Sequence, residues 1–390
     1  MSNIFAFTLE NTRVQARAGS ITTPHGQIKT PIFMPVGTRA SVRSLDSTDL
    51  EKLGAQIILG NTYHLYLKPN TEVMESAQGL HKFMRWEHPI LTDSGGYQVF
   101  SLGEQQLAKG RTSKIKITEA GVSFASHLDG TIHLITPEKS IQIQRSLGAD
   151  IIMVFDECLS DQAPMNRIVD SVARTNRWAQ RCKDEWVSAE RKSVYGKYQA
   201  LFGIVQGSTS VKLREQSLRS LLEIGFDGYA LGGETVGYDL ENTKQIMTSI
   251  NPLFPENSPR YAMGMGRDPQ DVIEAILMGF DMFDCVGPTR LARNGALFVG
   301  HLDTSSELPR FISEFPKGRL PIGNQRFAQD HAVLQENCDC FTCQAGYSRS
   351  YLHHLYKVSE LSYYRLASIH NLRVMINLAG VMREWIVQTG

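Results

Sequence analysis

Residues 149–157 read ADIIMVFDE, five consecutive apolar residues that end on two carboxylates. Seven other short apolar runs have the same form: PIFMPVG (31–37), AQIILGNTY (55–63), PILTDSGG (89–96), ALFGIVQG (200–207), GYALGGE (228–234), RYAMGMG (260–266) and DMFDCVGP (281–288). Each run precedes a polar or glycine-rich turn and then a stretch with helical spacing, such as REQSLRSLLEIG. Eight strand-like runs alternating with helices predict an α/β protein, a (β/α)₈ barrel.

Most of these runs carry a polar residue at their C-terminal end. The six positions are Asn61, Asp93, Asp156, Gln206, Glu234 and Asp284. In a (β/α)₈ barrel the C-terminal strand ends hold the active site. A single polar residue can simply mark where a strand stops, but six such ends, three of them aspartates, predict one pocket lined from several strands.

The composition limits the possible partners and the compartment. Lysine and arginine total 40, as do aspartate and glutamate, so a nucleic-acid partner must be held by a local basic patch. Residues 345–390 predict such a patch, because this segment contains five basic residues and only two acidic ones. The basic residues are Arg349, Lys357, Arg365, Arg373 and Arg383, and the acidic ones are Glu360 and Glu384. The N-terminus has no basic start before an apolar core, and no run of eighteen apolar residues occurs, so we expect a cytoplasmic protein without a membrane segment.

The sequence changes character near its C-terminal end. We expect a catalytic barrel with N-terminal β elements over residues 1–300, and a zinc-binding subdomain with helices packing on the barrel over 301–390. Three thiolates lie close together at Cys338, Cys340 and Cys343, which predicts a closed, structural zinc site, one per subunit. The fourth ligand is His353, His354 or His370; we favour His370, because a helix starting near Tyr363 could bring it back over the loop.

The carboxylates occur in segments suited to binding a planar base. Asp93 precedes Ser94, Gly95 and Gly96, which let the backbone approach a ligand, and Tyr97 offers a flat face for stacking. Asp156, Gln206 and Gly233 add donors and acceptors that match the edge of a guanine-like base. Asp284 ends the last run, and two carboxylates flanking one glycosidic carbon are the minimum for a retaining displacement.

These segments together resemble a known family. The chain is similar to the bacterial-type tRNA-guanine transglycosylases (queuine tRNA-ribosyltransferases) from about Thr12 to the final helix. The resemblance rests on motifs in the family's order: DSGGYQVF (93–100), DEC (156–158), QG (206–207), GG (232–233), MGMG (263–266), FDCVGPTR (283–290), the three-cysteine cluster and SIHNL (368–372). It implies a barrel with a zinc subdomain that works as a homodimer.

The resemblance also implies a reaction and a role for each residue. The reaction exchanges guanine at the wobble position of tRNAs with a GUN anticodon (Asp, Asn, His and Tyr) for a free 7-deazaguanine, through an aspartyl-ribose intermediate, in queuosine formation. Asp284 resembles the nucleophile and Asp93 the general acid/base. The base-binding set is Ser94, Gly95, Gly96, Tyr97, Asp156, Cys158, Gln206, Gly233, Glu234 and Met263, with Tyr97 and Met263 sandwiching the ring. The tRNA contacts are Gly266, Arg267, Asp268, Thr289, Arg290 and Arg293, and the zinc ligands are Cys338, Cys340, Cys343 and His370.

One segment departs from the bacterial pattern. Bacterial members that use the aminomethyl base preQ1 follow the glycine pair with a run ending in a glutamate that binds its ammonium group. Here the run is GGETVGYD (232–239), and Tyr238 replaces that glutamate. We hypothesise that the pocket accepts the larger base queuine, although Glu234 or Asp239 could swing in to supply a carboxylate.

Three alternatives are weaker. A noncatalytic tRNA-binding partner subunit of the same family should lack the nucleophile, whereas Asp93 and Asp284 are both present. Archaeal members that modify the D-loop carry additional C-terminal RNA-binding domains. An ordinary barrel glycosidase gives the cysteine cluster and the TRLAR segment (289–293) no role.

Overall fold

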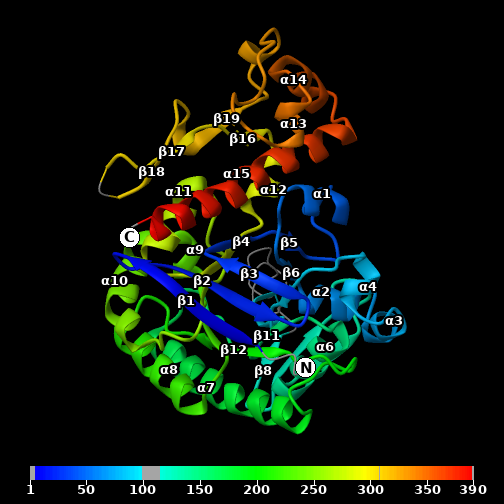
Figure 1. Ribbon diagram of the computed structural model, residues 1–390. Coiled ribbons are helices and arrows are strands. Elements are labelled where there is room, and N and C mark those ends of the chain that lie inside the picture. Colours follow the sequence, from blue (N-terminus) through cyan, green and yellow to red (C-terminus); the bar gives the residue numbers. More distant parts are fainter. Residues whose placement is uncertain (1–4, 99–114, 307, 389–390) are drawn as a thin grey trace.

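The computed structural model describes residues 5–98, 115–306 and 308–388 (Figure 1). Its largest sheet has nine strands in the order β4-β15-β14-β13-β12-β11-β7-β6-β5, and every pairing in it is parallel. The strands are β4 (Ile32–Met34), β5 (Val36–Gly37), β6 (Ile58–Gly60), β7 (Ile90–Thr92), β11 (Ile151–Met153), β12 (Ala200–Val205), β13 (Gly228–Leu231), β14 (Arg260–Ala262) and β15 (Met282–Asp284). Each predicted run supplies one barrel position, so the predicted fold is confirmed.

The sheet closes through its first strand. Residues 31–37 form both β4 and β5, which are separated by Pro35, a residue that has no N–H to donate to the ladder. β4 pairs with β15 on one side and β5 pairs with β6 on the other, while the Pro35 carbonyl still accepts from Leu59 N at 3.0 Å. The two ends of the nine-strand order are therefore halves of a single strand.

Helices connect successive strands around the outside of the barrel (Figure 1). Parallel strands covered in this way are buried on both faces, which is why their sequences read as continuous apolar runs. The helices are α1 (Ser47–Lys52), α2 (Thr62–Leu67), α3 (Thr71–Ser76), α4 (Leu80–Met84), α6 (Pro137–Leu147), α7 (Met165–Ser188), α8 (Val211–Ile224), α9 (Glu234–Tyr238), α10 (Leu240–Ile250) with the short η1 (Asn251–Leu253), α11 (Pro269–Leu277) and α12 (Gly287–Arg293).

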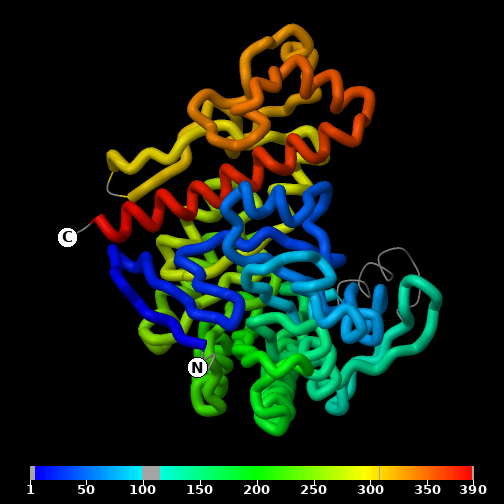
Figure 2. The backbone as a smooth tube through the Cα atoms, turned by 45° about the vertical axis from the view of Figure 1, so that its right-hand side comes forward, coloured from blue at the N-terminus to red at the C-terminus, as the bar shows by residue number. Residues whose placement is uncertain are grey.

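The outer helix that packs on β4 comes from the far end of the chain. After α12 the chain leaves the barrel and returns as α15 (Leu361–Val387), which packs on α11, α12, β1, β2 and β4 and bonds to α1 through Arg365 and Asp49 at 3.0 Å. In Figures 1 and 2 this helix is the red rod between the barrel and the orange subdomain. Asn371 anchors it, because its buried amide donates to the Pro288 and Ala296 carbonyls at 3.0 Å each and accepts from Phe298 N at 2.9 Å.

Smaller elements complete the fold. Antiparallel sheets form from β1 (Ala6–Arg13), β2 (Ala16–Thr23) and β3 (Gly26–Thr30), and from β8 (Lys116–Ile117), β9 (Val122–Ala125) and β10 (Ile132–Ile135), the second lying between β7 and α6 in the chain. The C-terminal part holds β16 (Ala296–Phe298) paired with β19 (Arg319–Pro321), β17 (His301–Asp303) paired with β18 (Arg310–Ile312), and η2 (Pro316–Gly318), η3 (Gln325–Phe327), α13 (Phe341–Gln344) and α14 (Arg349–Lys357). Within the described ranges, no helix has both the length and the apolar character needed to cross a membrane.

Candidate active site and metal centre

A cavity of about 370 Å³ opens at the C-terminal ends of the barrel strands. The expectation that the polar strand ends share one pocket is confirmed, because the cavity is lined from all eight barrel positions. Among its lining residues are Asn61, Asp93, Ser94, Gly95, Tyr97, Asp156, Cys158, Gln206, Gly233, Glu234, Met263 and Asp284. Gly96 lies directly behind it, where an added Cβ would come within 2.5 Å of the Asp156 carbonyl oxygen. Val99 and Phe100 of the DSGGYQVF motif lie outside the described residues.

Asp93 is buried at the end of β7 and is held by the neighbouring strand end. Asn61, which follows β6, donates its amide to Oδ2, and the Thr62 N–H donates to Oδ1 at 2.8 Å. Burial raises the pKa of the Asp93 carboxyl to about 7; the Thr62 N–H opposes this shift, and the charges of Asp284 and Asp156 add to it. A carboxyl that titrates near neutral pH can both give and take a proton at the working pH of an enzyme.

Hydrogen bonds from neighbouring residues hold only one oxygen of the Asp284 carboxylate. Its Oδ1 accepts from the Tyr261 hydroxyl at 2.6 Å and from Gly264 N at 2.9 Å, whereas Oδ2 has no donor on any other described residue. Burial raises the pKa of this carboxyl, and the two hydrogen bonds oppose the shift. Once ionised, such a carboxylate has one oriented oxygen available to attack an electrophilic carbon.

A polar set lies on the adjoining strand ends. Asp156 Oδ1 accepts from the Ser94 hydroxyl at 2.9 Å and Oδ2 accepts from Gln206 Nε2 at 2.7 Å. Gln206 thereby fixes its amide orientation and leaves its carbonyl oxygen toward Gly233, whose Cβ would lie 3.3 Å from it. Carboxylate, amide and backbone groups held in this way can read the edge of a planar heterocycle.

The two carboxylates nearest Tyr238 are both engaged. Glu234 Oε2 accepts from the Ser160 hydroxyl at 3.0 Å and from Asp161 N at 3.2 Å, which ties it to the loop after β11. Asp239 begins α10 and accepts from Asn242 N at 3.1 Å. Tyr238 lines the cavity and is 76% exposed. Neither carboxylate takes the place of the absent glutamate in this conformation.

The residues predicted to contact tRNA lie on the loop after β14 and on α12, beside the cavity. Arg267 and Arg290 are exposed, Arg293 is half-buried, and Gly266 is buried. Asp268 instead begins α11 with a reciprocal capping box and pairs with Arg319 at 2.5 and 2.6 Å. Thr289 is buried and donates its hydroxyl to the Val286 carbonyl at 3.3 Å. Internal bonds therefore already occupy these last two side chains.

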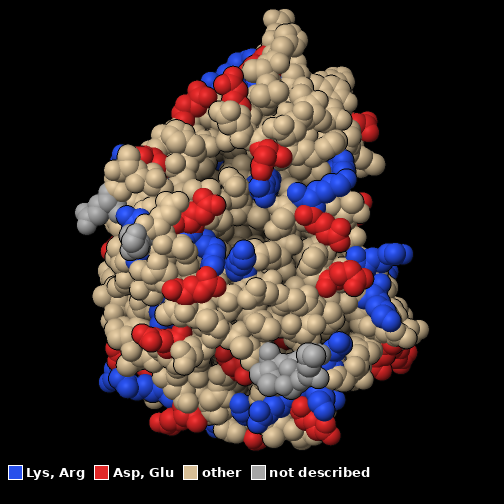
Figure 3. All heavy atoms as spheres, viewed as in Figure 1, with Lys and Arg blue, Asp and Glu red and all other residues tan. Residues whose placement is uncertain are grey.

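The prediction of a basic C-terminal tail is wrong. Arg349, Arg365, Arg373 and Arg383 form ion pairs with Asp330, Asp49, Asp339 and Glu10 respectively. The partners lie outside the 345–390 window, so counting charges within it could not find them. On the face that Figure 3 shows, basic and acidic side chains are likewise interspersed.

A different set of arginines carries unbalanced charge. Arg39, Arg43, Arg267, Arg290 and Arg293 make no ion pair within the described part of the chain, and all follow the C-terminal ends of β5, β14 or β15. Burial and the charges of Arg43 and Arg290 lower the pKa of Arg293. Arg39 and Arg43, on the loop after β5, were missed from the sequence because nothing in that segment marks it as adjacent to α12. We call these five residues the arginine rim.

Tyr261 was also missed. Its hydroxyl holds Asp284, but in the run RYAMGMG it reads as one more buried strand residue. Asn61 was noticed only as a polar strand end, and its bond to Asp93 depends on the pairing of β6 with β7. Local pattern gives neither role, because both depend on a neighbouring strand.

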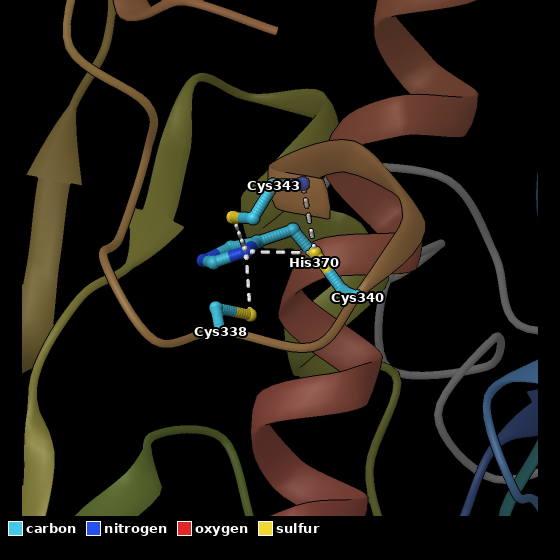
Figure 4. Close-up of side chains that lie close together, drawn as sticks. All are labelled: Cys338, Cys340, Cys343 and His370. Atoms are coloured by element: carbon cyan, nitrogen blue, oxygen red, sulfur yellow. Dashed lines mark hydrogen bonds between the residues drawn. The ribbon is translucent and has the colours of Figure 1, made fainter. Parts of the chain in front are cut away.

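The cysteine cluster is complete and includes His370 (Figure 4). His370 projects from α15, and its Nδ1 lies 3.7, 3.4 and 3.5 Å from the sulfurs of Cys338, Cys340 and Cys343. Zinc held tetrahedrally, about 2.3 Å from sulfur and about 2.1 Å from nitrogen, sets these ligand atoms roughly 3.6 Å apart. The four side chains are buried and could hold a metal ion in a closed site.

The orientation of His370 supports the same conclusion. Its Nε2–H donates to the Phe298 carbonyl at 2.6 Å, so the Nδ1 lone pair faces the sulfurs, the arrangement typical of a metal-binding histidine. His353 uses its Nδ1 to bond the Ile322 carbonyl at 2.8 Å, and the metal-binding group contains neither it nor His354. The structure thus groups His370, rather than His353 or His354, with the three cysteines.

A parallel barrel with two buried aspartates in one cavity, a polar base-sized recess and a Cys₃His cluster defines an enzyme of the glycosyl-transferring class. The family model described as queuine tRNA-ribosyltransferase matches residues 12–389. Proteins named queuine tRNA-ribosyltransferase from Fusobacterium nucleatum subsp. nucleatum and Herpetosiphon aurantiacus are 47% and 46% identical to this chain, covering 97% and 99% of it and 93% and 90% of their own lengths. The same-named protein of Koribacter versatilis is 46% identical over 99% of this chain and 95% of its own. The chain therefore belongs to the queuine tRNA-ribosyltransferase family and is a pentosyltransferase, a tRNA-guanine transglycosylase.

The raised pKa of Asp93 predicts a pH-dependent cost in stability. An unfolded aspartate titrates near 3.9, whereas Asp93 in the fold titrates at about 7, so the folded state binds more protons between these values. The contribution of this group to stability is full below about pH 4, falls as pH rises to about 7 and is constant above that. Asp93→Asn should therefore gain stability relative to the wild type between pH 5 and pH 8, measured as the free energy of urea unfolding. Exposed Asp170→Asn is the control; a difference that stays constant with pH would contradict the burial argument.

Proposed function

We propose that this enzyme exchanges guanine at the wobble position of tRNAs with a GUN anticodon for a free 7-deazaguanine, through an ester between Asp284 and ribose C1′. The observation that carries the proposal is the shared cavity of Asp93 and Asp284, in which one oxygen of Asp284 accepts no hydrogen bond from any other described residue. A covalent ester holds the ribose while one base leaves and another enters. Two inversions at C1′ then give net retention.

The proton balance closes over one cycle. In the first half, Asp284 Oδ2 attacks C1′, the C1′–N9 bond breaks with its electron pair on the purine, and protonated Asp93 supplies the proton that the departing base needs. In the second half, Asp93 takes a proton from the N9–H of the incoming base, which attacks C1′ and releases the Asp284 carboxylate. A pKa of about 7 for Asp93 suits both directions.

The base is proposed to bind between Tyr97 and Met263, with Asp156, Gln206 and Gly233 along its edge. All five line the same cavity. Guanine leaves poorly, so donors aimed at its edge must stabilise the charge that develops on it. Ser94 and Gln206 hold Asp156 in advance, which lowers the cost of reorganisation during the reaction.

The tRNA is proposed to present an unstacked anticodon loop, in the cytoplasm, with its phosphates on the arginine rim. The rim is the group of arginines near the cavity that lacks ion pairs in the described part of the chain, so its charge is available to phosphates.

The enzyme is proposed to be a homodimer. An exposed aromatic patch in the C-terminal part supports this, since Phe341 and Tyr351 are 47% and 44% exposed and Tyr347 stacks on Tyr351 at 5.7 Å.

The metal is proposed to be zinc, bound by Cys338, Cys340, Cys343 and His370. The ligand set and its spacing fit tetrahedral zinc, and four protein ligands leave no position for water or substrate. When bound, the ion supplies structural cross-linking between the cysteine loop and α15.

Metal analysis of the full-length protein should find one zinc per chain. His370→Ala should remove it and lower the midpoint of thermal unfolding, because metal binding energy becomes folding energy. His353→Ala is the matched control, since it removes a buried histidine from the same region while leaving the cluster intact. Full zinc occupancy in His370→Ala would contradict the proposed ligand set.

Asp284→Ala should lower the rate of exchange of radiolabelled guanine into unmodified GUN tRNA by at least about 10³-fold, because the nucleophile is lost. It should keep its affinity for tRNA, and it should form no tRNA–protein adduct on a denaturing gel. Exposed Asp170→Asn is the control. Exchange at the wild-type rate by Asp284→Ala would refute the covalent step. If the wild type exchanges no base, the noncatalytic tRNA-binding partner becomes the leading function.

The engaged state of Glu234 and Asp239 supports acceptance of queuine, since neither of these two carboxylates is free to bind the ammonium group of preQ1. Competition between the two bases for incorporation into tRNA measures the preference. Tyr238→Glu should shift it toward preQ1 by roughly tenfold, one added charge-assisted bond, and Tyr238→Phe should leave it unchanged. Efficient use of preQ1 by the wild type, without exchange of queuine, would end this hypothesis.

A further inference from the structure

Arg214 is the buried cation nearest the proposed base site. In the sequence it belongs to a helical stretch with alternating charges, yet in α8 its side chain is fully buried. Its Nε donates to the Ser208 carbonyl at 2.9 Å, and its Nη1 donates to the carbonyls of Val205 at 2.7 Å and Gly232 at 2.6 Å. One guanidinium thus joins the segment after β12 to the segment after β13.

The remaining nitrogen of Arg214 is directed to the cavity wall. Nη2 is buried without a hydrogen-bond partner in the described structure. It lies 3.0 Å from the point where a Cβ on Gly233 would stand, and Gly233 lines the cavity. Gly233 has a φ of +103°, so glycine is favoured there both by its conformation and by the guanidinium behind it.

The bond to Gly232 has a chemical consequence for Gly233. Both residues share one peptide group: its carbonyl accepts a charge-assisted bond from Arg214, and its N–H belongs to Gly233. That N–H has no acceptor among the described residues. A cation on the carbonyl end polarises the amide and makes the N–H a stronger donor. It also fixes the plane in which that donor lies.

We propose that Arg214 is a positioning residue for base exchange: it orients and polarises the Gly232–Gly233 peptide so that the Gly233 N–H donates to the exocyclic carbonyl oxygen of the guanine base. Negative charge collects on that oxygen as the C1′–N9 bond breaks, so a stronger donor stabilises the transition state more than the bound base. This inference rests on the proposed function. It adds to that function the Arg214 guanidinium as the group that controls recognition of the exocyclic oxygen of the base.

The first test compares Arg214→Met with Arg260→Met. Arg260 is a matched control, because it too is buried, burial lowers its pKa to about 10 as it does for Arg214, and it starts β14 at the opposite end of the barrel. Arg214→Met should lower kcat/KM for guanine exchange roughly 10- to 100-fold, less than loss of a direct oxyanion donor, with tRNA affinity unchanged. Arg260→Met should lower stability alone. Equal kcat/KM for guanine in the wild type and Arg214→Met would overturn the proposal.

The second test isolates the exocyclic oxygen of the base. Calorimetry compares binding of guanine with binding of 6-thioguanine, which keeps the N1–H and replaces that oxygen with sulfur, a weaker acceptor. The wild type should prefer guanine, and Arg214→Met should lose most of that preference, with Arg214→Lys in between because it keeps the charge. If both bases weaken equally in the variants, Arg214 only supports the fold and the proposal is wrong. Since binding is measured without exchange, this result stands apart from a failure of the proposed function, which would show as a wild type that exchanges no base.

Should Arg214→Met not fold, Arg214→Lys carries both tests. Its guanine preference must still fall below that of the wild type, because a single ammonium on a shorter chain cannot reproduce the fork geometry that reaches three carbonyls. An unchanged preference in a folded Arg214→Lys would overturn the proposal.

Discussion

Closure of the sheet through a strand that breaks at Pro35 is the constraint on which the active site depends. Because β4 pairs with β15 and β5 with β6, the ends of β15, β6 and β7 reach one mouth, bringing Asp284, Asn61 and Asp93 to one cavity. Both aspartates are buried there, and burial raises the pKa of each carboxyl. Burying these two carboxylates costs folding free energy. Hydrogen bonds from Asn61, Thr62, Tyr261 and Gly264 partly offset that cost.

Helix α15 links the metal centre to that mouth. It packs on β4 and α12, and one residue of it, His370, faces the three sulfurs and bonds the Phe298 carbonyl. The next residue, Asn371, bonds the backbone of Pro288, Ala296 and Phe298, the segment that follows the proposed nucleophile. The cysteine loop, α15 and α12 thus form one continuous packing unit that connects the Cys₃His cluster to the helix carrying Arg290 and Arg293.

Many of the charged side chains in this protein form ion pairs with one another. The protein has no net charge, and most arginines of the C-terminal tail are neutralised by carboxylates from other parts of the fold. The arginine rim and Arg214 are different, because the rim lacks ion pairs in the described part of the chain and Arg214 bonds only backbone carbonyls. Six arginines without a carboxylate partner in the described part of the chain thus lie where a polyanion and a base that becomes negative are proposed to bind.

The sequence by itself determined the eight strands, the polar residues that end them, the three thiolates and the family, because each is written in contiguous residues whose spacing has a local physical meaning. Tertiary structure alone decided which histidine completes the cluster, that Asn61 and Tyr261 hold the two aspartates, that the tail arginines are paired while Arg39 and Arg43 are not, and that Arg214 lies beneath Gly233. These facts depend on which segments barrel closure brings together. Contacts between residues tens to hundreds of positions apart produce no local pattern in the sequence. The topology of the closed sheet determines these contacts, so only the tertiary structure could reveal them.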